Sequence, residues 1–159
     1  MTARVEISLV RCEVRVSGQR APLAGQTLAL ALFLAAERCP VSSERLGTVL
    51  FGSTEQPRRA AKVYIHRLRA CIGRDAVIRR AGGYAYSEYV NIDVAAIESF
   101  VARTVDAPHT RASRAQARLL LAQLGAGRPD AVLAWGWFKP VERRLRRLAL
   151  DLRALVTSA

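Results

Sequence analysis

A run of basic residues between Pro57 and Arg80 is the part of this sequence best suited to chemistry. The run contains a single acid, Asp75. Its cations are Arg58, Arg59, Lys62, Arg67, Arg69, Arg74, Arg79 and Arg80. Long cationic side chains neutralise backbone phosphates, and they can also hydrogen-bond the edge of guanine. The segment is therefore a candidate for binding nucleic acid.

The first part of this segment has the periodicity of an amphipathic helix. Ala61, Ile65, Leu68 and Ile72 recur at spacings of four, three and four, which predicts one apolar stripe packed on a core. The opposite face carries Arg59, Val63, His66, Arg67 and Ala70, with Lys62 and Arg69 on one flank. Cations beside a small apolar side chain suit a major groove, where Val63 can contact a thymine methyl.

Simpler interpretations of this helix stay open. Most basic amphipathic helices present a solvated face, and the cations here are almost all arginine, as in proteins of GC-rich genomes. Taken alone, the helix indicates a plain surface as readily as a DNA contact. The elements around it favour the DNA contact.

A hairpin is predicted directly after the helix. Ala76–Arg80 and Tyr84–Ser87 form its strands, and Gly82-Gly83 forms its turn. The hairpin would place Arg79 and Arg80 beside the helix. A lone glycine turn usually marks an ordinary surface hairpin, so the interpretation depends on the order helix, strand, Gly-Tyr turn, strand.

Two strands and two helices are expected before the basic helix. Alternation of apolar and polar residues predicts an antiparallel sheet from Val5, Ile7 and Leu9 paired with Cys12, Val14 and Val16. Ala21–Ala24 is a candidate edge strand. The run Gln26–Arg38 is apolar almost all round, which predicts a helix at the centre of the core.

A second helix follows Pro40. Ser42 or Ser43 caps it, Leu46, Val49, Leu50 and Phe51 form its buried face, and Gly52 ends it. Ser53 or Gln56 then caps the basic helix, with Pro57 in its first turn. The predicted order is sheet, three helices and hairpin.

The composition is typical of a globular protein, and the net charge indicates an anionic binding partner. The 159 residues are 51% hydrophobic and 24% charged, and the net charge is +12. Nucleic acid is the expected partner, and an acidic membrane surface is the competing one. The most apolar run, Thr27–Ala36, is about half the length that a bilayer needs, and Glu6 and Arg11 interrupt any signal peptide. A cytoplasmic location follows.

Enzyme and metal chemistry find no support in the sequence. Cys12, Cys39 and Cys71 lie far apart with no paired spacing, which predicts neither disulfides nor a zinc site. His66 and His109 have no nucleophile or acid pattern beside them. We therefore expect no catalytic residue, no metal and no cofactor.

The segments LGTVLFG, VYIHRLRACIG and IRRAGGYAYS, in this order, resemble the OmpR/PhoB-type winged-helix DNA-binding domain over roughly the first 90 residues. The resemblance implies that the third helix enters the major groove and that the hairpin lies on the adjacent backbone or minor groove. It also places the family's recognition arginines at Arg59, Arg67 and Arg69, and its core residues at Val63, Ile65 and Leu68. Periodicity puts Val63 on the outer face, so its environment stays open.

The sequence departs from the family pattern at three places. Tyr64 stands where the family usually has histidine, and the wing reads Gly83-Tyr84-Ala85 without the family's arginine, a loss that Arg79 or Arg80 could replace. The loop Gly52–Gln56, which can contact RNA polymerase in the family, is short. The expected DNA-binding set is Arg58, Arg59, Lys62, Val63, His66, Arg67, Arg69, Arg79, Arg80 and Tyr84.

The second half of the chain is predicted to be helical. Asp93 caps a helix to about Thr104 with Ala96, Ile97, Phe100 and Val101 apolar, a linker covers Asp106–Thr110, and a second helix covers Arg111–Leu124. A segment with Trp135, Trp137 and Phe138 leads to Pro140. The final helix, Val141–Val156, has an apolar stripe formed by Val141, Leu145, Leu148, Leu152 and Leu155. This stripe either packs on the preceding helices, the favoured reading, or forms a homodimer seam.

NIDVAAIESFV and LGAGRPDAVL resemble the bacterial transcriptional activator domain of SARP-type regulators. The predicted fold is α+β: a winged helix over residues 1–90, followed by an all-α activator or dimerisation region over residues 91–159. The predicted function is sequence-specific, double-stranded DNA binding by a transcriptional regulator, with RNA polymerase as a further candidate partner and a nucleoid-associated location in a bacterial cytoplasm. The alternative is a winged-helix module that binds protein.

Overall fold

The computed structural model describes residues 3–52, 55–105, 107, 110–125 and 127–157. The chain forms two compact units, Met1–Ile92 and Asp93–Ala159. Some predictions fall on residues outside the described ranges. These residues are the candidate cap Ser53 and the linker residues Asp106, Pro108 and His109. Among the described residues, no helix combines the length and apolar character that crossing a membrane requires.

The first unit begins with a sheet in the order β3-β2-β1-β6. Strands β1 (Val5–Ser8) and β2 (Glu13–Val16) pair antiparallel, as predicted, and β3 (Gln19–Arg20) pairs antiparallel with β2. Strand β6 (Val90–Ile92) adds a parallel partner to β1 that the sequence did not indicate. Because β6 belongs to this sheet, the first unit extends two residues beyond residue 90.

The expected edge strand at Ala21–Ala24 is wrong. Ser17 and Gly18 both have positive φ, 51° and 83°, so the chain reverses within two residues and pairing resumes at Gln19. The N–H of Ala21 still donates to the carbonyl of Val14 at 2.8 Å. Pro22 has no N–H, which fits the end of the strand here.

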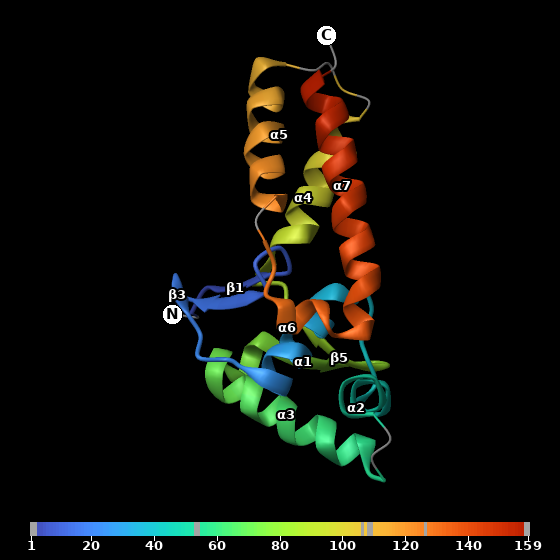
Figure 1. Cartoon of the computed structure of the whole chain (residues 1–159). Helices are drawn as coiled ribbons and strands as arrows, with labels where there is room; N and C mark the ends of the chain where they lie inside the picture. Colours follow the sequence, from blue (N-terminus) through green and yellow to red (C-terminus); the bar gives the residue numbers. More distant parts are fainter. Residues whose placement is uncertain (1–2, 53–54, 106, 108–109, 126, 158–159) are drawn as a thin grey trace. The chain divides into compact units, whose positions relative to one another are not determined.

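Helix α1 (Gly25–Ala36) forms the centre of the first unit, as its composition predicted. All residues from Ala29 to Ala35 are buried. The helix contacts β1 and β2 on one side and helix α3 (Pro57–Ile72) and strand β5 (Gly83–Tyr86) elsewhere (Figure 1). It is therefore the shared support of the sheet, the basic helix and the hairpin.

Helix α2 (Ser43–Phe51) packs on α3 through a face centred on Gly47. Ser42 caps the helix by accepting from the N–H of Arg45 at 3.1 Å, and Gly52 ends it with φ 65°. A Cβ on Gly47 would lie 2.1 Å from the carbonyl oxygen of Pro57, so the two backbones touch. This contact turns Val49 outward, to 37% exposure, and the prediction that Val49 is buried is wrong.

The hairpin is formed by β4 (Val77–Arg80) and β5, after a short 3-10 helix at Arg74–Ala76. Arg80 pairs with Gly83, so the turn is Ala81-Gly82 and the predicted Gly82-Gly83 turn is wrong by one residue. Gly83 serves a close approach instead, because a Cβ there would lie 2.0 Å from the carbonyl oxygen of Val41.

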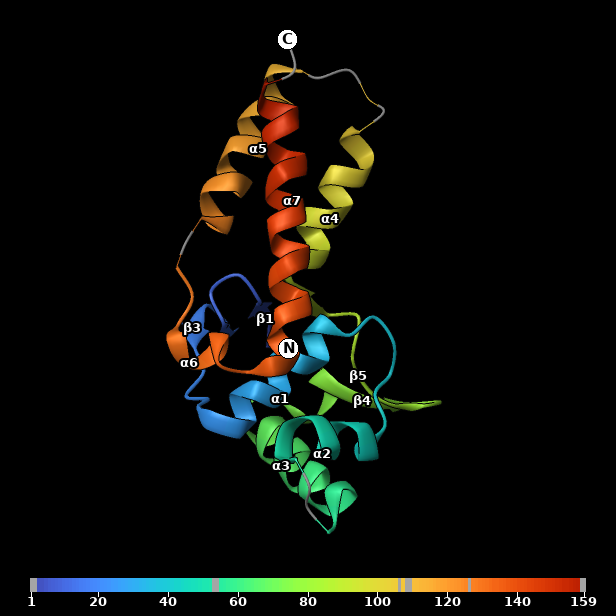
Figure 2. The ribbon, with the colours of Figure 1, turned by 45° about the vertical axis from the view of Figure 1, so that its right-hand side comes forward.

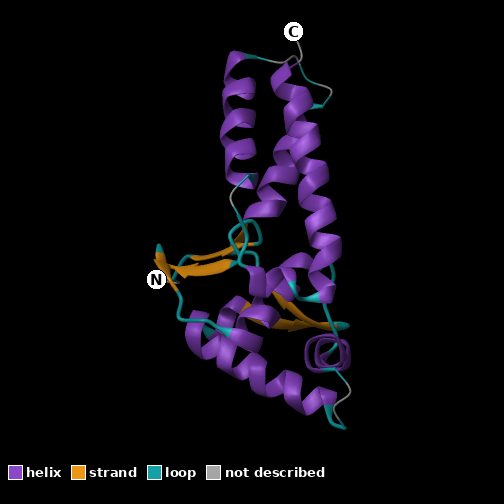
Figure 3. Cartoon of the chain, viewed as in Figure 1, coloured by secondary structure: helices purple, strands orange, loops and turns teal. Residues whose placement is uncertain are grey.

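The second unit consists of α4 (Asp93–Thr104), α5 (Arg111–Leu124), α6 (Asp130–Leu133), a 3-10 turn (Gly136–Phe138) and α7 (Lys139–Thr157). Helix α7 packs against both α4 and α5 and runs between them in Figure 2. Figure 3 shows that no strand is drawn in this unit's described residues. Pro140 lies inside the first turn of α7 rather than before it, because a helix's first turn tolerates a missing N–H.

The apolar stripe of α7 is buried in a single chain. Val141, Leu145, Leu148, Leu152 and Leu155 are each at most 7% exposed. The structure therefore shows the favoured arrangement, in which the stripe packs on the preceding helices. The surface that a homodimer seam through these five residues would use is covered within the single chain, and dimerisation stays a prediction.

Candidate nucleic-acid interface

The two faces of α3 separate as its periodicity predicted. Ala61, Ile65, Leu68 and Ile72 are at most 3% exposed. Side chains on the other side are exposed, namely Arg59, Lys62, Val63, His66 and Arg67. Val63 is 44% exposed, so its side chain belongs to the outer face and not to the core. The outer face carries three cations around one apolar side chain and one histidine.

Arg58 differs from the other cations of α3 because it is paired with an acid. Its guanidinium donates to a carboxylate oxygen of Glu44 in α2 at 2.7 Å. This hydrogen bond, together with the charge of Glu44, raises the pKa of Arg58. The pair joins the start of α3 to α2 and offsets part of the positive charge of Arg58.

Arg67 lies on a stack of aromatic rings. Its guanidinium carbon is 4.9 Å from the centroid of the Tyr64 ring. The other partner of Tyr64 is Phe51, at the end of α2, with ring centroids 4.6 Å apart and planes 22° apart. Arg59 on the same face makes a different contact, with the side-chain oxygen of Gln56 at 3.5 Å.

Two residues of the expected DNA-binding set lie in the joint between α3 and the hairpin. Arg69 donates from Nε and a terminal nitrogen to the carbonyl oxygen of Val77. Its guanidinium also lies over the ring of Tyr84, 5.7 Å from the centroid. Tyr84 is only 8% exposed, and its backbone exchanges two hydrogen bonds of 2.8 Å with Val41. The structure thus gives both residues contacts within the protein.

The hairpin presents the remaining predicted cations. Arg79 and Arg80 are exposed on β4, and Arg80 lies 3.7 Å from the carboxylate of Glu88. Arg74, which was counted in the basic run but left out of the DNA-binding set, lines a hollow of about 430 Å³ together with His66, Arg69 and Ala70. The only sequence signal for Arg74 was its membership of that run.

The described residues contain no cluster of three or more His, Cys, Asp or Glu side chains that could hold a metal ion. Cys12 is buried, whereas Cys39 and Cys71 are exposed. The chemistry available at the outer face of α3 is therefore cationic and hydrogen-bonding.

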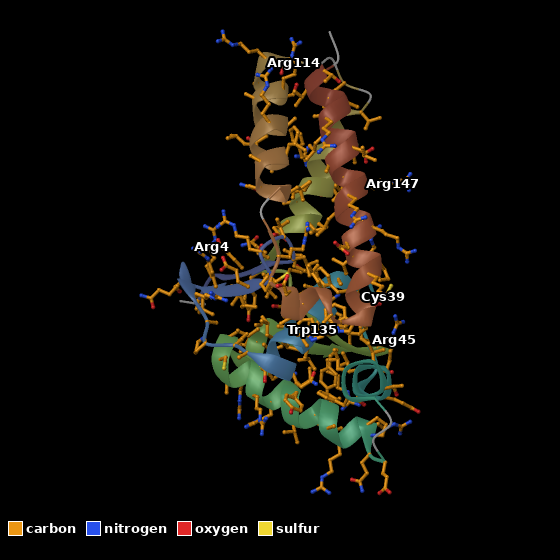
Figure 4. The ribbon with its side chains drawn as sticks, viewed as in Figure 1. Arg4, Cys39, Arg45, Arg114, Trp135 and Arg147 are labelled. Atoms are coloured by element: carbon orange, nitrogen blue, oxygen red, sulfur yellow. The ribbon has the colours of Figure 1, made fainter. Side chains whose placement is uncertain are left out.

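The second unit also carries exposed cations. Figure 4 labels Arg147 on α7, which is exposed, and Arg114 on α5, which is half-buried. Arg144 differs, because it forms a bidentate pair with Glu98 of α4. Arg147 thus provides an exposed arginine outside α3 against which the cations of α3 can be compared.

A solved structure has a fold similar to that of this chain. It is that of Mycobacterium tuberculosis EmbR in complex with a low-affinity phosphopeptide, with a TM-score of 0.71 and 15% sequence identity. The similarity covers 96% of this chain and 44% of the EmbR chain, so this chain spans less than half the length of that protein. No protein-family model matches the sequence. A search of curated proteins also found no match.

At 15% identity, the EmbR similarity bears on the fold alone. It agrees with the predicted α+β class, in which an N-terminal sheet, three helices and a hairpin precede a helical region. The arrangement of elements in the first unit is that of a winged helix, with α3 as its third helix and β4–β5 as its hairpin.

Proposed function

We propose that this protein is a sequence-specific transcriptional regulator that binds double-stranded DNA. In this proposal α3 enters the major groove, and the β4–β5 hairpin lies on the adjacent backbone. The second unit is the activator-like region of the regulator, which acts in the bacterial cytoplasm at the nucleoid. EmbR, a SARP-family regulator of similar fold, supports this assignment by analogy.

The outer face of α3 is the observation that carries the proposal. One helix exposes Arg59, Lys62 and Arg67 around Val63, while its opposite side is held in the core. A helix supported in this way can enter a major groove without losing its packing. Its cations can contact guanine edges or phosphates, and Val63 can contact a thymine methyl.

Arg79 and Arg80 extend the same charge onto the hairpin. Both are exposed beside the turn of a short two-stranded ribbon. Contacts from a ribbon tip to the sugar-phosphate backbone add affinity without reading sequence. We assign base reading to α3 and backbone contact to these two arginines. Arg74 and His66 line the hollow on α3 and the turn that follows it.

Selection of duplexes from a random DNA pool at near-physiological salt tests the proposal. We expect one motif to be enriched, and a direct or inverted repeat would report binding by a pair of chains. Because the α7 stripe is covered, such a pair would associate through another surface or through DNA alone. RNA polymerase is a further proposed partner. A separate experiment tests whether RNA polymerase binds the complex of this protein with DNA.

Point variants distinguish base reading from charge. Arg59→Ala and Arg67→Ala are each expected to lower affinity for the selected motif by about 1 to 3 kcal/mol if the residue is bidentate to guanine. Arg147→Ala removes an exposed arginine of the second unit and serves as the matched control. If DNA affinity falls steeply with salt and no motif is enriched, the protein binds DNA only by electrostatic attraction. Absence of DNA binding would favour the alternative, a protein-interaction module.

A further inference from the structure

We propose that Tyr64 is a positioning residue that holds Arg67 in the orientation needed to read a base, and this inference rests on the proposed DNA-binding function. The observation behind it is the three-layer stack of Phe51, Tyr64 and Arg67. The first layer comes from the end of α2 and the other two from α3.

The contact with Tyr64 leaves the N–H donors of Arg67 available to a base. A guanidinium group is planar, and its N–H donors point outward within the plane. The guanidinium carbon lies over the ring of Tyr64, 4.9 Å from its centroid. A contact through a flat side of the group would keep the donors at its edge available. Bidentate recognition of guanine uses such donors in a fixed fork. The contact with Tyr64 therefore orders the group without consuming its hydrogen bonds.

Core packing does not account for this arrangement. Phe51 and Tyr64 are both partly exposed, and Arg67 is exposed. A flexible arginine loses side-chain freedom when DNA fixes it, which opposes binding. A cation–π contact that orders the side chain beforehand removes part of this loss. The effect should then appear as sequence discrimination by Arg67 and not as general stability.

Arg59 and Arg69 show why Arg67 is singled out. Arg69 uses its donors on the carbonyl of Val77, so they are committed within the protein. Arg59 is exposed on the same face as Arg67, but its side chain contacts Gln56 and not an aromatic ring. Arg67 thus combines an exposed position with an aromatic support, and Arg59 is its matched comparison.

A double-mutant cycle on the full chain tests the inference. The measured quantity is discrimination, the dissociation constant for a duplex with one base pair changed at the position that Arg67→Ala affects, divided by the dissociation constant for the selected duplex. Arg67→Ala should lower this ratio about tenfold or more. Tyr64→Leu should lower it about threefold to tenfold, whereas Tyr64→Phe, which keeps the ring, should leave it within about twofold.

The cycle also requires that Tyr64 act through Arg67. Tyr64→Leu should cause no further loss of discrimination when Arg67→Ala is already present, but it should keep its full effect beside Arg59→Ala. Phe51→Leu, which removes the lower layer, should produce a smaller loss of the same kind. In the DNA-free protein, NMR should show the δ protons of Arg67 shifted upfield by the ring, with the shift kept in Tyr64→Phe and lost in Tyr64→Leu.

Several results would overturn the inference. One is independent, multiplicative losses from Tyr64→Leu and Arg67→Ala. Another is an equal loss of affinity for every duplex accompanied by a lower melting temperature, which would make Tyr64 purely structural. A loss in Tyr64→Phe as large as that in Tyr64→Leu would point to the hydroxyl. If the unmodified protein selects no motif, the proposed function itself fails, whereas a selected motif that Tyr64→Leu leaves unchanged defeats only the positioning role.

Discussion

Arg69 in α3 donates two hydrogen bonds to the backbone carbonyl oxygen of Val77 in β4, at 2.9 Å and 2.7 Å. The guanidinium group therefore joins the basic helix to the first strand of the hairpin. Because the same group lies over the ring of Tyr84 in β5, one side chain contacts both strands. This joint sets where Arg79 and Arg80 lie relative to the outer face of α3.

Removing the hydrogen bonds of Arg69 should lower the stability of the hairpin but leave the base preference of α3 largely unchanged. Arg69→Met keeps the apolar stem but removes the donors, leaving the carbonyl of Val77 without two hydrogen bonds. We expect a loss of about 1 to 3 kcal/mol in the free energy of unfolding, measured in urea. Affinity for the selected duplex should fall while the preference at the Arg67 position persists, as measured by competition binding.

Arg79→Met is the control for this prediction. Arg79 is exposed on β4, so its replacement should lower DNA affinity and leave the unfolding free energy within about 0.5 kcal/mol. If Arg69→Met instead keeps full stability and abolishes discrimination at one base pair, Arg69 itself reads a base.

A methyl group on Gly47 should separate α2 from α3. The added Cβ would lie 2.1 Å from the carbonyl oxygen of Pro57, and that oxygen is backbone and cannot rotate away. We expect Gly47→Ala to cost about 1 to 3 kcal/mol in thermal or urea unfolding. Val49→Ala, on the exposed side of the same helix, should change stability much less. A Gly47→Ala protein as stable as the original would show that the two backbones are not in close contact.

Tyr86 should make stability depend on pH in alkaline solution. Its hydroxyl donates to the carbonyl oxygen of Ala31 at 2.9 Å, and burial raises the pKa of the phenol above its usual value near 10. The unfolded chain then loses this proton first. The stabilising contribution is complete below about pH 10 and declines as the pH rises further, by up to about 1.4 kcal/mol per pH unit.

Tyr86→Phe provides the comparison for the alkaline decline. This variant lacks the titrating proton, so its unfolding free energy should decline less steeply above pH 10. Near neutral pH it should be less stable by about 1 kcal/mol because the carbonyl of Ala31 loses its donor. Parallel curves for both proteins between pH 9 and 12 would mean that another group controls the alkaline decline.

The pair between Arg144 and Glu98 should stabilise the second unit. It is bidentate, joins α7 to α4, and is less than one quarter exposed on either side chain. We expect Arg144→Ala to lower the unfolding free energy of this unit by about 1 to 3 kcal/mol, because the carboxylate of Glu98 would lose two charge-assisted hydrogen bonds. Circular dichroism during urea unfolding measures the loss.

Arg147→Ala is the matched variant on the same helix. Arg147 is exposed, so its loss should change stability by no more than about 0.5 kcal/mol. Equal effects from the two variants would show that helix propensity or net charge, and not the ion pair, controls stability here.

The sequence alone was sufficient where structure follows from spacing within one element. The stripe Ala61, Ile65, Leu68 and Ile72 is buried as its periodicity predicted, and α4 and α5 have the predicted bounds. The cap at Ser42 depends on Arg45, three positions away. Such signals lie within one or two turns of helix, so a short window of sequence contains them.

Partners brought together by the fold required the tertiary structure. Ala31 and Tyr86 are 55 positions apart, and no local pattern indicates their hydrogen bond. The spacing of Arg69 assigned it to the flank of a DNA-binding face, although its donors reach Val77 across a turn of the chain. Likewise, Gly83 was read as a turn residue, whereas its lack of a Cβ admits the backbone of Val41. The sequence by itself determined which residues share a face, because periodicity is local, but only folding decided what each face meets, because that depends on the path of the whole chain.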